Sequence, residues 1–98
     1  MTKEDIKRVL LNNKKILKKY KVNKIGIFGS FATGKMRKKS DVDLLVEFDD
    51  LIDLVDFVHL NDEIQQILKS KVDLVTSDTI KPYIKPKTLK EVERVAGL

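Results

Sequence analysis

Hydrophobic side chains recur three or four positions apart in two long stretches of this chain, and this spacing predicts two amphipathic helices. The first is expected over residues 3–20, where Thr2 and Asp5 resemble a capping box at the helix start. The second is expected from Asp53 to about Ser70. The apolar positions of the two stripes are Ile6, Val9, Leu10, Ile16, Leu17 and Tyr20, then Leu54, Phe57, Val58, Leu60, Ile64, Ile67 and Leu68.

Shorter apolar runs lie around the second helix and predict β-strands. Residues 24–28 form the first run, which ends at Gly29-Ser30, and residues 72–76 form the last. In the run between them, Val42, Leu44, Val46 and Phe48 alternate with Asp41, Asp43, Leu45 and Glu47. Alternation with period two is typical of a strand that buries one face.

The remaining segments predict shorter or irregular structure. Residues 30–35 are expected to form a short helix that begins at the Gly-Ser turn, and residues 36–40 a basic loop. Pro82 and Pro86 each disfavour helix at the preceding residue, so residues 78–87 are expected to carry at most a turn or two.

A last helix is expected over residues 88–96, because its apolar positions share one face and Gly97 follows as a stop. This order of elements favours an α/β (α+β) fold with a small mixed sheet of three to four strands and helices packed on one face. The other face would stay open for a site. With 98 residues and 42% hydrophobic content, residues 1–98 are expected to form one domain without a separate substrate domain.

Two carboxylates on the second strand are the main candidates for chemistry. Asp41 and Asp43 share a strand face with their Cα atoms roughly 6.5 Å apart, so both can lean toward cations spaced about 3.5–4 Å apart. Gly29 allows close backbone approach, and the Ser30 hydroxyl with nearby N–H groups can cradle phosphate oxygens. The pattern therefore predicts a two-metal nucleotidyl-transfer site. The alternative is a solvated edge strand beside a plain turn.

A third carboxylate is needed to bind the catalytic metal and help deprotonate the acceptor hydroxyl. Asp73 is the candidate, because it is flanked by strand residues, although it could also be an outward-facing strand residue. Asp78 and Glu47 are the reserves. The lone histidine, His59, falls between the apolar positions of its helix and is expected to be exposed.

The charge is distributed unevenly along the chain, whose net charge is +5. It is +5 over residues 1–20, +6 over 21–40, −8 over 41–70 and +2 over 71–98. A basic half facing an acidic middle suits a site that binds a polyanion through carboxylate-held Mg²⁺. The lysines of the first helix are expected to form a solvated face rather than a nucleic-acid-binding surface, because no aromatic residues are interleaved with them.

Other features of the sequence bear on triphosphate binding, on cysteine chemistry and on membrane insertion. Arg37, Lys38 and Lys39 could add positive charge to a triphosphate, or could form a plain solvated loop. The absence of cysteine excludes disulfides and thiolate metal sites. No apolar run approaches the 18 or more residues of a membrane span, and the charged N-terminus is not followed by a signal-like apolar region, so a cytoplasmic protein is expected.

Three segments together resemble a known family. They are GSFATG at residues 29–34, SDVDLLV at residues 40–46 and KVDLVT at residues 71–76. This combination resembles the minimal nucleotidyltransferases of the DNA polymerase β superfamily, and more narrowly the MNT antitoxins that are usually encoded beside a HEPN-domain toxin. The likeness runs from about residue 20 to residue 95.

The resemblance implies a short mixed sheet, ATP as substrate and two Mg²⁺ ions. It places Gly29 and Ser30 on the triphosphate, and makes Asp41, Asp43 and Asp73 the metal-binding catalytic carboxylates. Family members are thought to transfer AMP onto a tyrosine of the HEPN ribonuclease and so silence it. Many relatives have Arg, a possible phosphate contact, where this chain has Thr33.

Three hypotheses follow for function. The first is a protein adenylyltransferase that acts on its HEPN partner, which the short chain supports because it leaves no room for a substrate domain. The second is a non-enzymatic antitoxin or nucleotide-sensing module that neutralises its partner by binding. The third is a nucleic-acid-binding protein that uses the basic half. A homodimer and a hetero-oligomer are both compatible with the resemblance.

Overall fold

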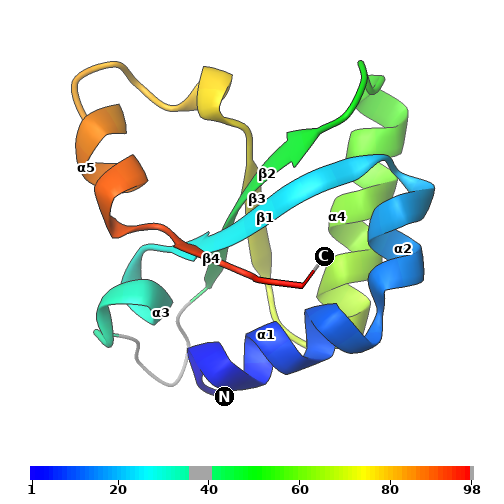
Figure 1. Cartoon of the computed structure of the whole chain (residues 1–98), viewed down its shortest axis with the longest axis horizontal. Helices are drawn as coiled ribbons and strands as arrows, with labels where there is room; N and C mark the ends of the chain where they lie inside the picture. The colour runs from blue at the N-terminus through cyan, green and yellow to red at the C-terminus, as the bar shows by residue number, and fades with distance from the viewer. Residues whose placement is uncertain (36–40, 98) are drawn as a thin grey trace.

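A computed structural model of the chain describes residues 1–35 and 41–97, in which four strands form one mixed sheet of order β3-β2-β1-β4 (Figure 1). β1 runs antiparallel to both β2 and β4, whereas β2 and β3 are parallel. The strands are β1 (Val22–Phe28), β2 (Val42–Phe48), β3 (Val72–Val75) and β4 (Glu93–Arg94). The parallel pair is possible because the helix between β2 and β3 carries the chain back across one face of the sheet.

The helices lie on both sides of this sheet, but only one face is thickly covered (Figure 1). The helices are α1 (Lys3–Asn12), α2 (Lys14–Lys19), α3 (Ser30–Thr33), α4 (Leu54–Leu68), the single 3₁₀ turn η1 (Ser77–Thr79) and α5 (Lys85–Glu91). Side chains of α1, α2 and α4 join one buried cluster with the sheet, whereas α5 stands beside the opposite face. The predicted mixed α/β fold is confirmed, and the second sheet face is open except beside α5.

The core lies between α1, α2, α4 and the sheet. Ile6, Ile27, Leu44, Leu60 and Ile64 are completely buried. Period two along β1 and β2 places Ile27 in register with Leu44 on this face, so both stack beneath the helices. Truncation of any of these leucines or isoleucines to alanine costs about 2–5 kcal/mol in well-packed interiors. This cluster therefore fixes the strands whose other face carries the polar residues.

The expected helix over residues 3–20 is two helices. The capping box is present, with the Asp5 carboxylate accepting from the Thr2 N–H and the Thr2 hydroxyl accepting from the Asp5 N–H. The break falls at Asn13, whose side-chain amide donates to the Val9 carbonyl at 2.7 Å. An asparagine side chain that bonds to the preceding turn competes with the helical backbone, which explains why the stripe continues while the helix does not.

The expected helix over residues 88–96 is wrong in its second half. α5 begins earlier, with Pro86 in its first turn, where a missing N–H costs nothing. Val92 is extended (φ −63°, ψ 133°), and the chain then pairs with the free edge of β1 as β4. Burial of Val95 and two ion pairs of Glu93 outweigh the weak helical preference of this segment.

Those ion pairs join β4 to the first helix. Lys3 Nζ and Lys7 Nζ lie 3.0 and 3.3 Å from the Glu93 carboxylate oxygens, and lower the pKa of that carboxyl. The amide of Val95 also donates to the Ile25 carbonyl at 2.9 Å.

Within the described part of the chain, no helix has the length and apolar character needed to cross a membrane.

Candidate active site

Strand pairing brings the candidate carboxylates to one end of the open sheet face. In the parallel register of β2 and β3, Asp43 lies opposite Asp73, and strands paired in this way are about 4.8 Å apart. Asp41 directly precedes β2, two residues before Asp43 and therefore on the same side. Asp41 and Asp73 are exposed, whereas Asp43 is half-buried between its neighbours. All three predicted carboxylates thus lie together.

The electrostatics of this cluster centre on Asp43. Burial raises the pKa of the Asp43 carboxyl, and the negative charges of Asp73 and then Asp41 raise it further. An ionised Asp43 is therefore disfavoured in the folded chain unless a cation balances the three carboxylates. This crowding of oxygen ligands is the first property that a divalent metal site requires.

A tight glycine turn packs directly against the Asp43 side chain. Gly29 has φ 70° and ψ −146°, a combination that is essentially restricted to glycine. A Cβ atom at this position would overlap the carboxylate Oδ2 of Asp43. β1 places the turn here because Phe28, the last residue of the strand, is in register with Asp43. Gly29 is thus needed both for its backbone conformation and for the space it leaves.

Ser30 begins α3 directly after this turn and is half-buried. Gly29 has no side chain to cap α3, and the first backbone N–H groups of a helix have no acceptor within the helix. The Thr33 hydroxyl donates back to the Gly29 carbonyl at 3.2 Å. Thr33 therefore braces the turn in this structure.

The other candidates are separated from this cluster or lie outside the described residues. Arg37 and Lys38, predicted to contact the triphosphate, fall within residues 36–40 and are not described. Glu47 and Asp78, the reserve carboxylates, both line a cavity of about 450 Å³ at the far end of β2. Four residue steps along β2, or about 13 Å, separate Glu47 from Asp43. Of the candidates for the third carboxylate, only Asp73 is next to Asp43 in the sheet.

The donor set fits Mg²⁺, which binds oxygen ligands and commonly takes one or two carboxylates together with substrate phosphates. Among residues 1–35 and 41–97, no group of three Asp, Glu, His or Cys side chains is already arranged closely enough to hold a metal ion. The carboxylates are adjacent in the sheet without forming a closed cage. A site of this kind, open on one side, leaves coordination positions for phosphate oxygens and water.

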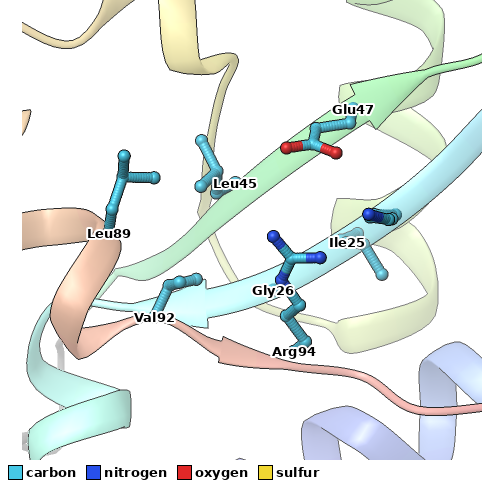
Figure 2. A pocket seen from close by; sticks show the side chains of 8 residues that line it. Ile25, Gly26, Leu45, Glu47, Leu89, Val92 and Arg94 are labelled. Atoms are coloured by element: carbon cyan, nitrogen blue, oxygen red, sulfur yellow. The ribbon is translucent and has the colours of Figure 1, made fainter.

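A cavity on the same open face was not anticipated from the sequence. It has a volume of about 280 Å³ and lies between the sheet and α5 (Figure 2). Its lining comprises Lys24, Ile25, Gly26, Leu45, Glu47, Leu89, Val92 and Arg94. Two of these side chains come from the segment mistaken for helix, so the cavity could not be foreseen. Gly26, in the interior of β1, is the one signal available, because glycine within a strand often marks a close approach.

Carboxylates from neighbouring strands that face a glycine–serine turn are the arrangement that a nucleotidyltransferase uses to hold metal ions and a triphosphate. That class is confirmed by comparison with known families. The family described as "Polymerase beta, Nucleotidyltransferase" matches residues 11–96. The chain therefore belongs to this family, and the resemblance to its minimal, MNT-type members is confirmed.

Relatives and solved structures agree with this assignment. MJ0128 of Methanocaldococcus jannaschii is 50% identical over 86 residues, which cover 86% of this chain and 88% of that protein. Protein adenylyltransferase MntA of Thermococcus cleftensis is 37% identical over 93 residues, 94% of each chain. A solved structure of a tri-AMPylated Shewanella oneidensis HEPN toxin in complex with MNT antitoxin shares the fold, with a TM-score of 0.66 and 22% identity over 94% of this chain and 73% of that chain.

Proposed function

We propose that this chain is a Mg²⁺-dependent adenylyltransferase that moves AMP from ATP to a tyrosine hydroxyl of a HEPN toxin, and so acts as its antitoxin. The observation that carries the proposal is the parallel register of Asp43 with Asp73, beside a turn that only Gly29 can form. The name of the MntA relative and the AMPylated toxin in the Shewanella complex support the choice of a protein acceptor.

The chain's own residues have separate roles in this proposal. Gly29 and Ser30 receive the triphosphate at the start of α3, and Arg37 and Lys38 add positive charge to it. Asp41 and Asp43 would hold two Mg²⁺ ions, which would supply positive charge to the transferred and leaving groups. Asp73 lies on the outer strand, where its carboxylate can accept the proton of the incoming hydroxyl.

Nucleotide binding is expected to depend on divalent metal. A triphosphate that meets three carboxylates in a partly desolvated site faces like-charge repulsion, which cations remove. Isothermal titration calorimetry should therefore detect ATP binding in Mg²⁺ and little or none in EDTA. Equal ATP affinity under both conditions would rule out the two-metal site.

The second candidate is an antitoxin that neutralises its partner by binding alone. The two candidates differ in stoichiometry, because a catalyst turns over and a binding inhibitor does not. A small molar amount of this chain with MgATP should abolish the ribonuclease activity of a large molar excess of HEPN protein. It should have no effect when ATP is omitted. Silencing that needs equal amounts of the two proteins, with or without ATP, would favour neutralisation by binding.

The surface offered to a protein partner lies around α5. Tyr83 is 77% exposed, and Ile84 and Leu89 are each 43% exposed, so three large apolar side chains lie on the surface here. Exposed apolar side chains in this density commonly mark an interaction site. Because α5 borders the open sheet face, a protein docked here would lie beside the carboxylates.

Substitution of Tyr83 is expected to weaken transfer to the partner by about tenfold and to leave ATP binding unchanged, because the ring is a docking contact. Leu54→Ala on α4 is the matched control for Tyr83→Ala, since Leu54 is also 77% exposed. Transfer rates at several partner concentrations should show a raised KM for the Tyr83 variant alone. Equal rates for both variants and the unchanged chain would remove this surface from the interface.

Truncation before Pro82 is a cruder version of the same test. The deletion also removes β4, the buried Val95 and the ion pairs of Glu93. It is therefore expected to lower the melting temperature by circular dichroism as well as to impair partner modification. Free tyrosine modified as fast as the partner would show that docking is not required.

A further inference from the structure

The N-terminal half of α4 is apolar on two opposite sides. Leu60 and Ile64 belong to the buried cluster between the helices and the sheet. Val58 lies four positions after Leu54 and three after Val55, so these three side chains share one face of the helix. Because Val58 and Leu60 are two residues apart, they point about 200° apart around the helix axis. The second apolar face therefore points away from the core.

This outer apolar face of α4 is largely exposed. The exposed fractions are 77% for Leu54, 63% for Val55 and 48% for Val58, and Leu51, just before the helix, is 94% exposed. Later along the same face the helix is polar, as at the exposed Gln66. Single exposed apolar residues are common on protein surfaces, whereas a contiguous group is typical of an interaction site. We call Leu54, Val55 and Val58 the α4 patch.

The surroundings of the α4 patch are acidic. Asp53 lies at the start of the helix, where its carboxylate accepts from the Asp56 N–H, and both side chains are exposed. Among the residues that the structure describes, neither takes part in an ion pair within 4.0 Å. The segment 49–63 has no lysine or arginine and six carboxylates, which are Asp49, Asp50, Asp53, Asp56, Asp62 and Glu63.

The lysines that approach α4 and the loop before it are already paired. Lys19 Nζ lies 3.0 Å from the Glu63 carboxylate, and Lys21 Nζ lies 3.6 Å from the carboxylate of Asp50. These pairs leave the two carboxylates at the start of α4 unbalanced. The α4 patch is therefore an apolar surface with negative charge at its edge.

The α4 patch and the candidate active site lie on opposite sides of the sheet. α4 packs against the sheet face that carries the core, whereas α5 stands beside the open face on which the carboxylates lie (Figure 1). A helix bound to the patch is separated from these carboxylates by α4 and the sheet, so it cannot deliver a hydroxyl to them. It also leaves the surface around Tyr83 uncovered. The patch thus suits a contact that is separate from acceptor docking.

The charges decide between two kinds of partner. A symmetric dimer would bring the same surface of two copies together, and would place Asp53 and Asp56 of one copy against those of the other. Like charges opposed across an interface disfavour such a contact. A helix that carries lysine or arginine beside an apolar stripe complements the patch in both respects. Leu54 and Val58, four positions apart, form the kind of ridge that packs into a groove of another helix.

We infer that the α4 patch binds an amphipathic helix of a protein other than the acceptor, with lysine or arginine on both sides of its apolar stripe. The stripe covers Leu54, Val55 and Val58, and the basic side chains meet the carboxylates of Asp53 and Asp56. Binding at this face needs neither ATP nor metal. The chain then holds two proteins at once, one on each side of its sheet.

Synthetic peptides test the chemistry of this partner. Leucines recur at three- and four-residue spacing in two of them, with lysine at the other positions of one and glutamate at those of the other. The Leu/Lys peptide is expected to shift the amide signals of Leu54, Val55 and Val58 in the ¹⁵N-labelled chain, and the Leu/Glu peptide is not. A third peptide has the Leu/Lys composition with its leucines on all sides. Equal affinity for this third peptide, or shifts confined to residues around Tyr83, would overturn the inference.

A charge placed in the α4 patch gives the matched test. Val55→Lys should weaken binding of the Leu/Lys peptide by about tenfold or more. Gln66→Lys adds the same charge about three turns further along the same face, and should keep the affinity within about twofold. Both side chains are exposed, so both variants should melt at the temperature of the unchanged chain. If the unchanged chain sediments as a dimer and Val55→Lys as a monomer, the patch holds a second copy and the inference is wrong.

Competition shows whether this partner is separate from the acceptor. A saturating amount of the Leu/Lys peptide should leave the rate of AMP transfer to the HEPN protein unchanged. Inhibition that rises with occupancy of the α4 patch would place both proteins on one surface and contradict the inference. If the chain modifies no protein, the proposed function fails, and the peptide titrations still decide the role of the patch.

Discussion

Replacement of Asp43 by asparagine is expected to lower AMP transfer by about 100-fold or more while the chain remains folded. Asp43 is central to the cluster, with Asp73 opposite it and Asp41 two residues before it. An amide keeps the shape of the side chain but removes the charge that would hold a cation. Asp41→Asn should have an effect of similar size.

The control for these variants is Asp62→Asn. Asp62 is exposed on α4, away from the open sheet face, so loss of its charge should leave transfer unchanged. Single-turnover rates with the HEPN partner and MgATP would compare the three variants. Near-normal rates for Asp41→Asn and Asp43→Asn would refute the assignment of these carboxylates.

Asp43→Asn should raise the stability of the metal-free folded chain, although it lowers AMP transfer. The folded-state pKa of Asp43 is raised above its ordinary value of 3.8. At a pH between these two pKa values, the folded chain holds a proton that the unfolded chain has lost. The free energy of unfolding of the metal-free chain therefore falls as pH rises from the ordinary pKa to the raised one. The neutral amide removes that loss, so Asp43→Asn should melt higher than the unchanged chain at pH 7 and show little advantage below about pH 4. Added Mg²⁺ should stabilise only the unchanged chain.

Gly29→Ala is expected to damage both the site and the fold. Alanine would be forced into a glycine-only conformation, at a cost of about 1–3 kcal/mol, and its Cβ would displace the Asp43 carboxylate. Transfer should fall by about 100-fold or more, because a displaced carboxylate cannot hold a metal in place. Thermal melting and transfer rates would be measured on the same preparation.

Gly34→Ala separates these two effects. Gly34 also has a positive φ (78°), at the C-terminal end of α3, but a Cβ there would meet nothing within 4 Å. This variant should therefore lose about 1–2 kcal/mol of stability while keeping most of its transfer activity. Equal activity losses in Gly29→Ala and Gly34→Ala would mean that backbone strain alone, and not contact with Asp43, explains the glycine.

Much of the sheet could be predicted because its signals are local. The alternation around Val42 and Leu44 fixes which face of β2 is buried, and therefore which side Asp43 takes. The position of Asp73 beside Asp43 could not be predicted from local signals alone, because it depends on the parallel pairing of β2 with β3. Sequence showed only that Asp73 is flanked by strand residues, whereas the crossover through α4 determines the register.

The elements that could not be predicted depend on contacts distant in sequence. β4 has only two residues and a helical pattern of apolar positions, and it exists because β1 offers an edge and Lys3 and Lys7 offer charges to Glu93. The cavity between the sheet and α5 depends on this strand and on the end of α5. The break at Asn13 is a local signal, but one that a continuous apolar stripe conceals.

The most direct test of the account is intact-protein mass spectrometry of a HEPN-family protein that binds this chain. The HEPN protein would be incubated with a small amount of the chain, ATP and Mg²⁺, and then fragmented to locate any added group. The account predicts adenylyl groups on tyrosine, and none with the Asp43→Asn variant or in EDTA. A partner that is silenced yet unmodified would contradict it.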